Sequence, residues 1–464
     1  MIAFRLAFAA AVIAAVLTTP ARAEAPWSSP STVTVGNPQL AEPTIAFGGD
    51  GRGLLSARIT TKTNGVPSRG FSRLFAEQGD GSFSGRGRLV LAAPPAVYGK
   101  TRTALLRLPL AQGDLTATDL DRPQSSMGNA FGRTDGTFSA YRRFTTRADR
   151  TTGAIAADDR GDVAAMWIEH REGRDQLLVA IRRPNRDFAR PTVIAGSGFL
   201  SSPVVAWSAG GDLLVAYQRS VTTAGRTERR VEARVRRAGH SWGAAQRLGR
   251  SSGFSDIAVA AAPNGRMVVA WGTQDLGIQA DTPWIVRAAM RPAGPRSFRA
   301  AQQLDVGDLH ERPVGRVATA MAPDGTATVA WSRMARTRSG PQAATANSTL
   351  RFKAAQQLSP SGAVGDVAVS RDGTALVVWS TPAHVLNDET SAQVFANLRP
   401  ARQQTFAAPE AVGPPEGAHQ PRAAFDPRTG RPAVVWIAQP DTQPDAPSQP
   451  GSQTQLLRYA HRTG

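Results

Sequence analysis

The sequence predicts an all-β fold assembled from one repeated unit. The chain of 464 residues shows no heptad pattern and no long amphipathic helical pattern. Two short apolar runs flank Asp372-Gly373, and the second run ends on Trp379. An Asp-Gly pair accepts the positive φ that a tight hairpin turn requires, so this stretch predicts two antiparallel strands. The same turn, followed by an aromatic residue, recurs along the chain.

The first marker of the repeat is a turn glycine with an aromatic residue six positions later. The pairs are Gly161/Trp167, Gly211/Tyr217, Gly265/Trp271, Gly325/Trp331, Gly373/Trp379 and Gly430/Trp436. Gly51 opens the series with Ala57 in the aromatic slot, and Gly99 with Leu105 is a degenerate copy. We expect each aromatic ring to wedge one unit against the next, where it buries about 150–250 Å². The alternative is a set of exposed rings that stack on carbohydrate.

The second marker is an aromatic residue with an apolar residue six positions later. The pairs are Trp27/Val33, Phe83/Leu89, Phe138/Phe144, Phe188/Ile194, Trp242/Leu248, Phe298/Leu304, Phe352/Leu358 and Phe406/Val412. Successive aromatic residues of this series lie between 50 and 56 residues apart. Periods of this size are typical of propellers and solenoids.

Each unit contains four strand-length segments, which describes one blade of a β-propeller. The last unit stops after three segments, at 422–426, 432–437 and 455–459, whereas an extra fourth segment stands alone near Trp27. We therefore predict a single propeller of eight four-stranded blades, whose ring is closed by residues 26–35 completing the C-terminal blade. Seven blades is the alternative, because the second unit is so degraded. Closure leaves no open sheet edge.

The N-terminus reads as a secretory signal peptide covering residues 1–23. Arg5 precedes an apolar run from Leu6 to Leu17, and Ala21-Arg22-Ala23 is a small-x-small cleavage site. The propeller would then occupy residues 24–464, and no later stretch is long and apolar enough for a membrane helix. We expect a secreted, periplasmic or cell-envelope protein that is a monomer.

The composition of the chain excludes several kinds of site and gives it a large positive charge. There is no cysteine, which excludes disulfides, thiolate metal sites and a cysteine nucleophile. The formal charge is +18, and removal of Arg5 and Arg22 leaves 18 − 2 = +16, carried almost entirely by arginine. One interpretation is a solvated arginine surface from a GC-rich genome. The other is electrostatic affinity for an anionic polymer outside the cell.

Propeller topology divides the connections between two faces. The loops between the second and third strands, and those that lead to the next blade, share one face and are the longer ones, as expected for a binding surface. This face collects acids and histidines, and those we favour as catalytic candidates are His310, Glu311, Glu416 and His419. The others are Glu169, His170, Glu172, Asp275, Asp281, Asp305, Asp308, His384, Asp388, Glu389, Asp441 and Asp445. Paired carboxylates could hydrolyse a glycosidic bond; ordinary solvated loops are the alternative.

The opposite face carries arginines in the turns between the third and fourth strands. These residues are Arg182, Arg183, Arg236, Arg237, Arg291, Arg296, Arg399 and Arg402. Together with Arg462 they predict a broken basic rim whose guanidinium groups match phosphate, sulfate or carboxylate. The alternative is again a solvated turn surface. Nucleic acid is not expected, because the protein is exported and no base-stacking motif interleaves these arginines.

The repeat resembles secreted bacterial β-propeller proteins, including the sialidase-like group. Ser370-Arg371-Asp372-Gly373 is similar to the Asp-box of that group but lacks the spacer before glycine. Residues 425–430 resemble a turn of quinone-dependent dehydrogenase propellers, although it occurs once and Trp436 is misplaced. The resemblance covers nearly the whole mature chain and implies the fold; neither family's catalytic residues match here.

No further motif identifies a cofactor or a metal. There is no His-Glu-x-x-His, phosphate-binding glycine-rich loop or calcium loop. The sequence therefore predicts no cofactor and no metal, and favours an exported non-enzymatic binding or scaffold protein. Its partner would be an anionic cell-envelope polymer, a glycan or a protein. The alternative is a carbohydrate-active hydrolase or lyase with loop carboxylates near the propeller axis.

Overall fold

The structure is a computed structural model of the whole chain. It describes residues 27–34, 39–47, 51–60, 62–63, 66–67, 71–78, 82–89, 96–98, 101–109, 125–132, 142–148, 153–158, 160–171, 173–184, 186–223, 225–251, 256–274, 284–307, 316–333, 340–381, 392–439 and 455–463. The predicted signal peptide lies outside these residues. Within them every regular element is a strand, and no helix is long and apolar enough to cross a membrane.

The strands form eight four-stranded antiparallel sheets, which we number in chain order. Sheet 1 contains β2 (Gln39–Phe47), β3 (Gly53–Thr60), β6 (Phe71–Glu77) and β7 (Phe83–Leu89), and a two-stranded ribbon of β4 (Lys62–Thr63) and β5 (Val66–Pro67) lies between β3 and β6 in the chain. Sheet 2 contains β8 (Ala96–Tyr98), β9 (Thr101–Pro109), β10 (Ser125–Gly132) and β11 (Arg142–Ala148). The degenerate second unit therefore forms a sheet with the same strand order as the others.

Sheets 3 to 6 follow the same plan. Sheet 3 contains β12 (Gly153–Ala157), β13 (Val163–Arg171), β14 (Arg174–Arg182) and β15 (Thr192–Gly196). Sheet 4 contains β16 (Phe199–Trp207), β17 (Leu213–Thr223), β18 (Arg226–Arg236) and β19 (Gln246–Arg250). Sheet 5 contains β20 (Ile257–Ala261), β21 (Met267–Gln274), β22 (Trp284–Arg291) and β23 (Gln302–Val306). Sheet 6 contains β24 (Ala318–Met321), β25 (Ala327–Arg333), β26 (Gly340–Ala346) and β27 (Gln356–Gln357).

The last two sheets end the chain. Sheet 7 contains β28 (Ala363–Val369), β29 (Ala375–Ser380), β30 (Val394–Arg399) and β31 (Glu410–Ala411). Sheet 8 contains β32 (His419–Phe425), β33 (Pro432–Ala438) and β34 (Leu456–His461), and its fourth strand is β1 (Ser31–Thr34). We call sheet 8 the closing sheet, because it joins the two ends of the chain.

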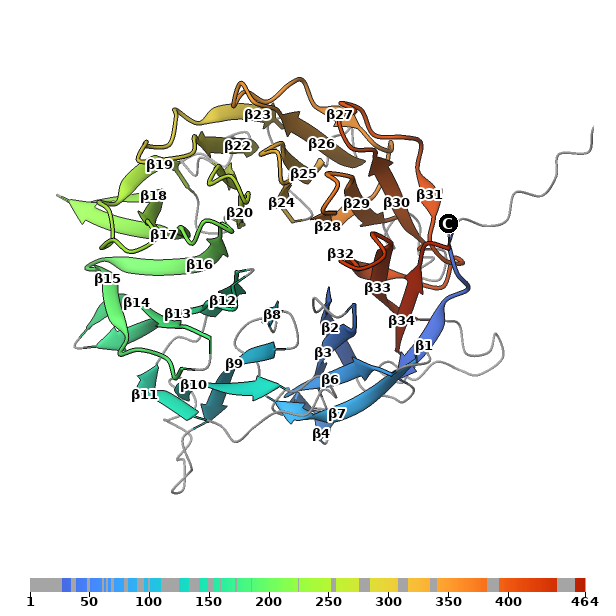
Figure 1. Ribbon diagram of the computed structural model, residues 1–464, viewed down its shortest axis with the longest axis horizontal. Helices are drawn as coiled ribbons and strands as arrows, with labels where there is room; N and C mark the ends of the chain where they lie inside the picture. Colours follow the sequence, from blue (N-terminus) through green and yellow to red (C-terminus); the bar gives the residue numbers. More distant parts are fainter. Residues whose placement is uncertain are drawn as a thin grey trace, which may run out of the picture.

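The sheets are arranged around a common axis as a β-propeller (Figure 1). The first strand of every sheet lies nearest the axis, and these inner strands are β2, β8, β12, β16, β20, β24, β28 and β32. Each inner strand contacts the inner strand of the next sheet, and β32 contacts β2. Residues that are far apart in the sequence therefore meet at the axis.

The closing sheet has the pairing that the sequence predicted for the N-terminal segment. Ser31 lies opposite Tyr459, and Thr32 lies opposite Arg458. Trp27 forms an antiparallel bridge with Arg462. The N–H of Ser28 donates to the carbonyl of His461 at 2.8 Å.

The aromatic residues that follow the turn glycines are buried, as the first interpretation of the repeat predicted. Trp167, Trp271, Trp331 and Trp436 have no exposed surface, and Tyr217 and Trp379 are almost as completely buried. This burial excludes the stacking of a ligand on these rings. They are the largest buried side chains of the sheets and fix how adjacent sheets pack.

The fourth segment of several units is shorter than the sequence predicted. In sheet 7 the marker pair Phe406/Val412 predicts a fourth strand over these residues, but only Glu410–Ala411 pairs with β30. In sheet 6 the aromatic residue Phe352 makes a single bridge to Ala346, and β27 begins four residues later. This outermost segment has a neighbouring strand on one side alone, so fewer ladder bonds hold it extended.

Glutamine side chains link neighbouring sheets at three junctions. The carboxamide of Gln302 in sheet 5 donates to the carbonyl of Phe352 at 2.8 Å and accepts from its N–H at 3.0 Å. Gln246 binds Phe298 in the same way, and Gln356 binds Phe406. Each glutamine satisfies a backbone donor and a backbone acceptor of the next sheet.

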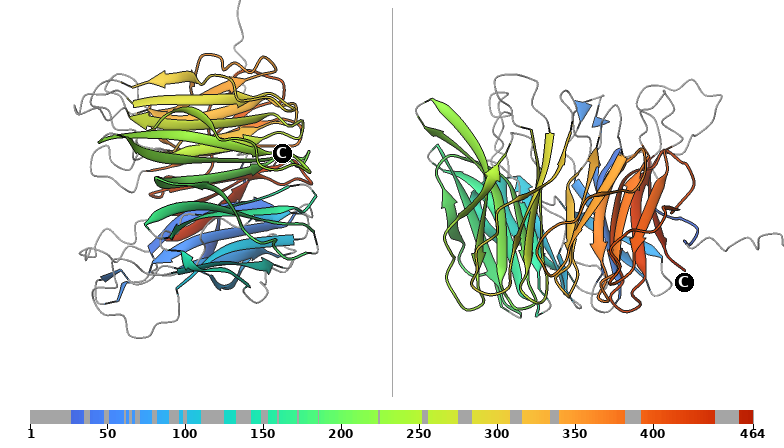
Figure 2. Two further views of the ribbon diagram at one scale, coloured as in Figure 1. Left: turned by 90° about the vertical axis from the view of Figure 1, so that its left-hand side faces the viewer. Right: turned by 90° about the horizontal axis from the view of Figure 1, so that it is seen from above.

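The two faces of the ring differ as the topology requires. Figure 2 shows the short turns that join neighbouring strands on one face of the ring. We call the face formed by the connections between strands one and two, and between strands three and four, the short-turn face. The opposite face, the long-loop face, holds the β17–β18 hairpin, which stands above its neighbours in the right-hand view.

Candidate functional site

Three acids of the long-loop face accept hydrogen bonds from the indole groups of buried tryptophans. Glu169 accepts a hydrogen bond from the Trp167 indole at 3.0 Å, and Asp305 accepts one from Trp331 at 2.8 Å. Glu169 is completely buried. A buried indole N–H needs an acceptor, so these carboxylates stabilise the sheets.

Glu416 belongs to the same group. One of its oxygens accepts from the Trp436 indole at 3.1 Å, and the other accepts two hydrogen bonds from the Arg458 guanidinium, at 2.7 and 3.1 Å. Its side chain is 7% exposed. Both oxygens are occupied inside the closing sheet, so Glu416 is placed to hold that sheet together.

The other predicted catalytic candidates divide into two groups. His310 and Glu311 lie outside the described residues. His419 is the first residue of the inner strand β32, and its Nδ1 lies 3.2 Å from the carbonyl of Gly417. Of the four candidates, His419 is the one that the described structure places on an inner strand.

Three inner strands share a bulge that the sequence analysis missed. Glu42, Ser202 and Gln420 have positive φ angles of 52°, 50° and 53°, and each is followed by proline. Pairing with the second strand shifts at each of these positions. Bulges change the direction of side chains and are frequent near functional sites. An x-Pro pair early in the first strand is the sequence signal that could have identified them.

Charged residues from five sheets gather around these bulges. We call Glu42, Asp256, Arg316, Asp366 and Arg422 the axial cluster. Glu42, Asp366 and Arg422 lie on inner strands, whereas Asp256 and Arg316 lie one or two residues before β20 and β24. Arg422 interacts electrostatically with each of the other four residues, and Asp256 also interacts with Arg316.

Backbone contacts hold the axial cluster across sheet boundaries. The Arg422 guanidinium donates to the carbonyl of Gly365 in sheet 7 at 2.7 Å. The N–H of Glu42 in sheet 1 donates to the Gln420 side chain in the closing sheet at 2.8 Å. A Cβ atom at Gly365 would lie 2.2 Å from the carbonyl oxygen of Pro421, so only glycine permits this close approach.

Burial shifts the pKa values of two groups in the axial cluster. It lowers the pKa of Arg422 to about 10; nearby Arg316 acts in the same direction, whereas Asp366, Glu42 and Asp256 oppose the shift. Burial also raises the pKa of Asp256, against the effects of Arg316, the Val317 N–H and Arg422. Asp256 is nevertheless exposed to solvent, so the neighbouring sheets crowd its carboxyl group without covering it. Perturbed groups of opposite charge are typical of functional sites.

The predicted basic rim divides into fixed and exposed arginines. Arg182 donates to the carbonyl of Arg186 at 2.7 Å, Arg291 to that of Gly294 at 2.6 Å, and Arg399 to that of Gln403 at 2.7 Å. Arg291 and Arg399 are almost completely buried, and burial lowers the pKa of all three. All three arginines bind carbonyl groups of their own turns. The burial of Arg291 and Arg399 corrects their predicted role as surface ligand-binding residues, whereas that role stays a prediction for the half-buried Arg182.

The remaining rim positions face solvent. Arg183, Arg237, Arg296 and Arg402 are exposed, whereas Arg236 is half-buried. Each exposed arginine lies one or more residues beyond the end of a third strand, where no neighbouring strand covers it. Four of the eight predicted rim positions are therefore exposed, and their role in binding stays a prediction.

Other basic residues of the short-turn face extend the rim. The exposed basic residues of its described connections are Arg52, Arg160, Arg183, Arg186, Arg190, Arg237, Arg296, Arg299, Arg351, Lys353, Arg371, Arg402, Arg428 and Arg431. The exposed acidic residues there are Asp187, Asp324 and Asp372. Fourteen exposed cations thus stand against three exposed carboxylates, so this face carries a strong positive field.

The described residues contain no group of three or more His, Cys, Asp or Glu side chains that could hold a metal ion. No protein-family model matches the chain, and a search of curated proteins found no match. The chain is similar to solved structures at low identity. These include the β-propeller domain of the Trilobed protease from Pyrococcus furiosus (9% identity, 82% of this chain and 99% of that chain, TM-score 0.42).

Two further solved structures are carbohydrate-active enzymes. An ulvan lyase of a polysaccharide lyase family is 10% identical over 83% of this chain and 96% of that chain, with a TM-score of 0.46. The NanB sialidase from Streptococcus pneumoniae is 9% identical over 94% of this chain and 70% of that chain, with a TM-score of 0.41. Similarity at this level transfers no substrate, reaction or catalytic residue to this chain.

Proposed function

We propose that this protein is an exported binding or scaffold protein, a closed ring of eight blades that holds an anionic cell-envelope polymer on its short-turn face. Export rests on the N-terminal sequence alone. The binding role rests on one observation, the fourteen exposed cations against three exposed carboxylates among the described residues of that face. Export of the protein would place the exposed cations of this face outside the cytoplasm.

Fixed turns make these cations an effective polymer-binding surface. Asp158 accepts hydrogen bonds from the N–H groups of Arg160 and Asp162, both at 2.9 Å, and Asp426 accepts one from that of Arg428 at 2.9 Å. The acids therefore hold the turns while the arginines project. Exposed guanidinium groups pair with phosphate, sulfate and carboxylate in a bidentate manner. Many weak contacts on one rigid ring add up to useful avidity.

The proposal is tested by retention on immobilised lipopolysaccharide and on immobilised teichoic acid, with elution in a sodium chloride gradient. Arg183→Gln combined with Arg237→Gln removes two exposed charges that follow β14 and β18. Each exposed ion pair contributes roughly 0.2–1 kcal/mol. We expect earlier elution of the double variant, and affinity at least about tenfold weaker when Arg296→Gln and Arg402→Gln are added.

A matched control lies at the other end of the same two strands. Arg174 and Arg226 are exposed at the starts of β14 and β18, on the long-loop face. Arg174→Gln combined with Arg226→Gln removes the same net charge and should leave elution nearly unchanged. Equal losses for the two double variants would show that net charge alone retains the protein, and would reject the short-turn face as the binding surface.

A second candidate function is a carbohydrate-active hydrolase or lyase at the propeller axis. The axial cluster supports it, because Asp256 has a raised pKa beside Arg316 and Arg422. A raised pKa favours proton donation by a carboxyl group, and two nearby guanidinium groups can hold an acidic sugar. His419 begins the strand that carries Arg422.

Turnover of a glycan panel tests this second candidate. The panel should include uronate-containing, sulfated, sialylated and neutral polymers, and reducing-end and unsaturated-product assays distinguish a hydrolase from a lyase. Asp256→Asn should reduce any turnover by at least about 100-fold, whereas Asp372→Asn on the short-turn face should not. Absence of turnover across the panel, or full activity of Asp256→Asn, would reject an axial catalytic site.

A further inference from the structure

The hairpin of sheet 4 is longer than its counterparts. Strands β17 and β18 each have 11 residues, whereas the equivalent pairs in sheets 3 and 5 have 9 and 8. The extra length extends Leu213–Thr223 and Arg226–Arg236 beyond the long-loop face (Figure 2). The extension is not needed to fill the ring, so it points to another purpose.

A cavity of about 720 Å³ lies beside this hairpin. Its volume falls within the range of about 300–1,000 Å³ that small-molecule sites occupy. The residues that line it are Ser197, Gly198, Phe199, Gln218, Arg219, Ser220, Val221, Thr222, Thr227 and Arg229. The lining combines one aromatic ring, two guanidinium groups and several hydroxyl groups, and it contains no acid.

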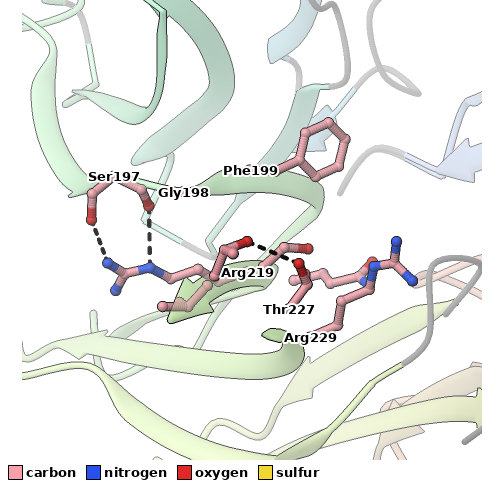
Figure 3. Close-up of a pocket in the computed structure, with 10 residues that line it drawn as sticks. Ser197, Gly198, Phe199, Arg219, Thr227 and Arg229 are labelled. Atoms are coloured by element: carbon pink, nitrogen blue, oxygen red, sulfur yellow. Dashed lines mark hydrogen bonds between the residues drawn. The ribbon is translucent and has the colours of Figure 1, made fainter. Parts of the chain in front are cut away.

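One aromatic ring and a polar wall face the cavity from different sides. Figure 3 shows the Phe199 ring on one side, and Thr227 with Arg229 on the other. Phe199 is 47% exposed and is the one aromatic residue among the exposed large apolar side chains of the described chain. The exposed part of the ring offers an apolar surface on which the face of a sugar can pack.

The loop at the base of the cavity is held in an unusual conformation. Ser197 and Gly198 have φ angles of +71° and +78°, and a Cβ at Gly198 would lie 2.3 Å from the carbonyl of Ser220. Arg219 donates to the carbonyls of Ser197 at 3.2 Å and Gly196 at 3.3 Å. A non-glycine residue in this conformation persists only where its surroundings impose it, and such positions are frequent at binding sites.

Buried groups fix Arg219 in turn. Its guanidinium lies 3.6 Å from the carboxylate of Glu232, which also accepts a hydrogen bond from the Tyr217 hydroxyl at 2.9 Å. Glu232 is 3% exposed and Tyr217 is 1% exposed. The core therefore positions one wall of the cavity before any ligand arrives, which lowers the entropic cost of binding.

Arg229 differs from Arg219. It is exposed at the opposite side of the cavity, and the described residues offer its guanidinium no hydrogen bond and no carboxylate partner. The hydroxyl groups of Thr222 and Thr227 lie 2.9 Å apart close by. An unpaired guanidinium beside hydroxyl groups and an aromatic ring matches a sugar that carries an anionic group.

We propose that this cavity is a binding site for a saccharide unit with an anionic substituent, carboxylate or sulfate. The apolar face of the sugar ring packs on Phe199, Arg229 pairs with the anionic group, and the threonine and serine hydroxyls bind the sugar hydroxyls. This site lies on the long-loop face and is separate from the polymer-binding surface proposed for the short-turn face.

Calorimetric titration of the mature protein tests the proposal with three probes. Trigalacturonate carries carboxylates, a carrageenan tetrasaccharide carries sulfate without carboxylate, and maltotriose is neutral. We expect at least one acidic probe to bind more tightly than maltotriose. Phe199→Ala should weaken that binding about tenfold or more, and Arg229→Gln should abolish the preference over maltotriose.

Matched controls separate this site from general charge and general apolar surface. Arg226→Gln removes a charge three residues from Arg229 on the same strand, outside the cavity, and Val193→Ala removes an exposed apolar side chain elsewhere in the fold. Both should bind like the unaltered protein, and circular dichroism should show that all variants are folded. No binding of either acidic probe, or equal losses for Arg229→Gln and Arg226→Gln, would overturn the proposal.

The two proposals can fail independently. Arg183→Gln with Arg237→Gln should leave calorimetric binding of the acidic probe unchanged, because those residues lie at the other ends of the strands. If the same variant weakened the binding of a short oligosaccharide as much as Arg229→Gln does, the cavity would not be the site. Retention on polymer and binding of a small acidic saccharide are thus separate measurements.

Discussion

The junctions between sheets use two kinds of side-chain link. Three interior junctions use a glutamine, Gln246, Gln302 or Gln356, which makes two neutral hydrogen bonds to the backbone of one aromatic residue in the next sheet. The junction with the closing sheet uses Glu410 instead. Its carboxylate accepts from the Trp27 indole at 3.0 Å and from Arg462 at 3.1 Å.

The difference follows from the path of the chain. At the interior junctions the aromatic residue belongs to a segment that continues directly from the third strand of its own sheet. In the closing sheet the aromatic residue comes from the N-terminal segment, and Arg462 comes from the C-terminal end. Glu410 therefore contacts both ends of the chain at once. Charge-assisted hydrogen bonds are stronger than neutral ones. Here they hold together the two ends of the chain, which no peptide bond connects.

The closing sheet also matters for the axis. Arg422 in β32 donates to Gly365 of sheet 7, and Gln420 accepts from Glu42 of sheet 1. If the closing sheet lost stability, Gln420 and Arg422 would move, and both make hydrogen bonds that hold the axial cluster. The links at the junctions therefore matter for function as well as for stability, and four experiments test whether the closing junction differs from the interior ones.

The largest effect is expected from Trp27→Ala. Trp27 is 4% exposed and makes an indole hydrogen bond as well as packing in the closing sheet, so its truncation should cost about 3–5 kcal/mol of unfolding free energy. Trp242→Ala is the matched control, because Trp242 occupies the equivalent position in sheet 4 but is half-buried. Urea denaturation measures both. Equal losses would mean that the closing sheet is no more dependent on its aromatic residue than an interior sheet.

A smaller effect is expected from Gln302→Glu. The carboxylate can still accept from the Phe352 N–H, but it cannot donate to the Phe352 carbonyl and instead places an oxygen against it. Loss of a donor at such a site costs about 1–3 kcal/mol. The adjacent exposed residue provides the control, because Gln303→Glu makes the same change in solvent. A Gln302→Glu variant as stable as Gln303→Glu would show that the glutamine link contributes nothing measurable.

Glu410→Gln should cost about 1 kcal/mol, because it retains an acceptor for Trp27 and loses the ion pair with Arg462. Both partners of that pair are about one-third exposed or less, so part of the effect should disappear in high salt. Stability measured at low and high sodium chloride separates the ionic contribution. Glu228→Gln, which breaks a more exposed ion pair with Arg247, serves as the control and should change stability less.

The smallest effect concerns pH. Burial and the nearby Arg431 lower the pKa of His461, which ends β34 and contacts Ser28. The unfolded chain therefore binds more protons than the folded chain as pH falls below about 6.5, and the closing sheet loses stability there. The protection factors of the amides in residues 27–34, which correct for the intrinsic pH dependence of exchange, should fall between pH 7.5 and pH 5.5. His461→Gln should remove that change, and a pH dependence that survives this substitution would assign it to another group.

Much of the fold could be predicted because it depends on local, periodic signals. A turn glycine followed by a buried aromatic residue sets one hairpin, and its recurrence sets the number of units. A sequence pattern also marks the glutamine links. An aromatic residue is followed by any residue and then by Ala-Ala-Gln, and the pattern ends at Gln246, Gln302 and Gln356. The pattern does not by itself reveal a link, because the partner of each glutamine lies in the next sheet.

The site was harder to predict, because side-chain direction depends on neighbours that are distant in the sequence. Glu169, Asp305 and Glu416 could not be recognised as acceptors for buried indoles from their position in loops. Nor could Arg399, which caps its own turn, be distinguished from Arg402, which faces solvent. Two arginines a few residues apart can differ in burial because the packing of the blades covers one and not the other.

The sequence by itself determined the all-β repeat, the buried aromatic series and the segment that pairs with β34, since strand patterning and turn chemistry act within a few tens of residues. The packing of the sheets, by contrast, determines which charges meet at the axis, which arginines are exposed to solvent and where the cavity beside Phe199 lies. Those properties arise where residues from different sheets come together. The distances and burial that define them exist only in the assembled ring.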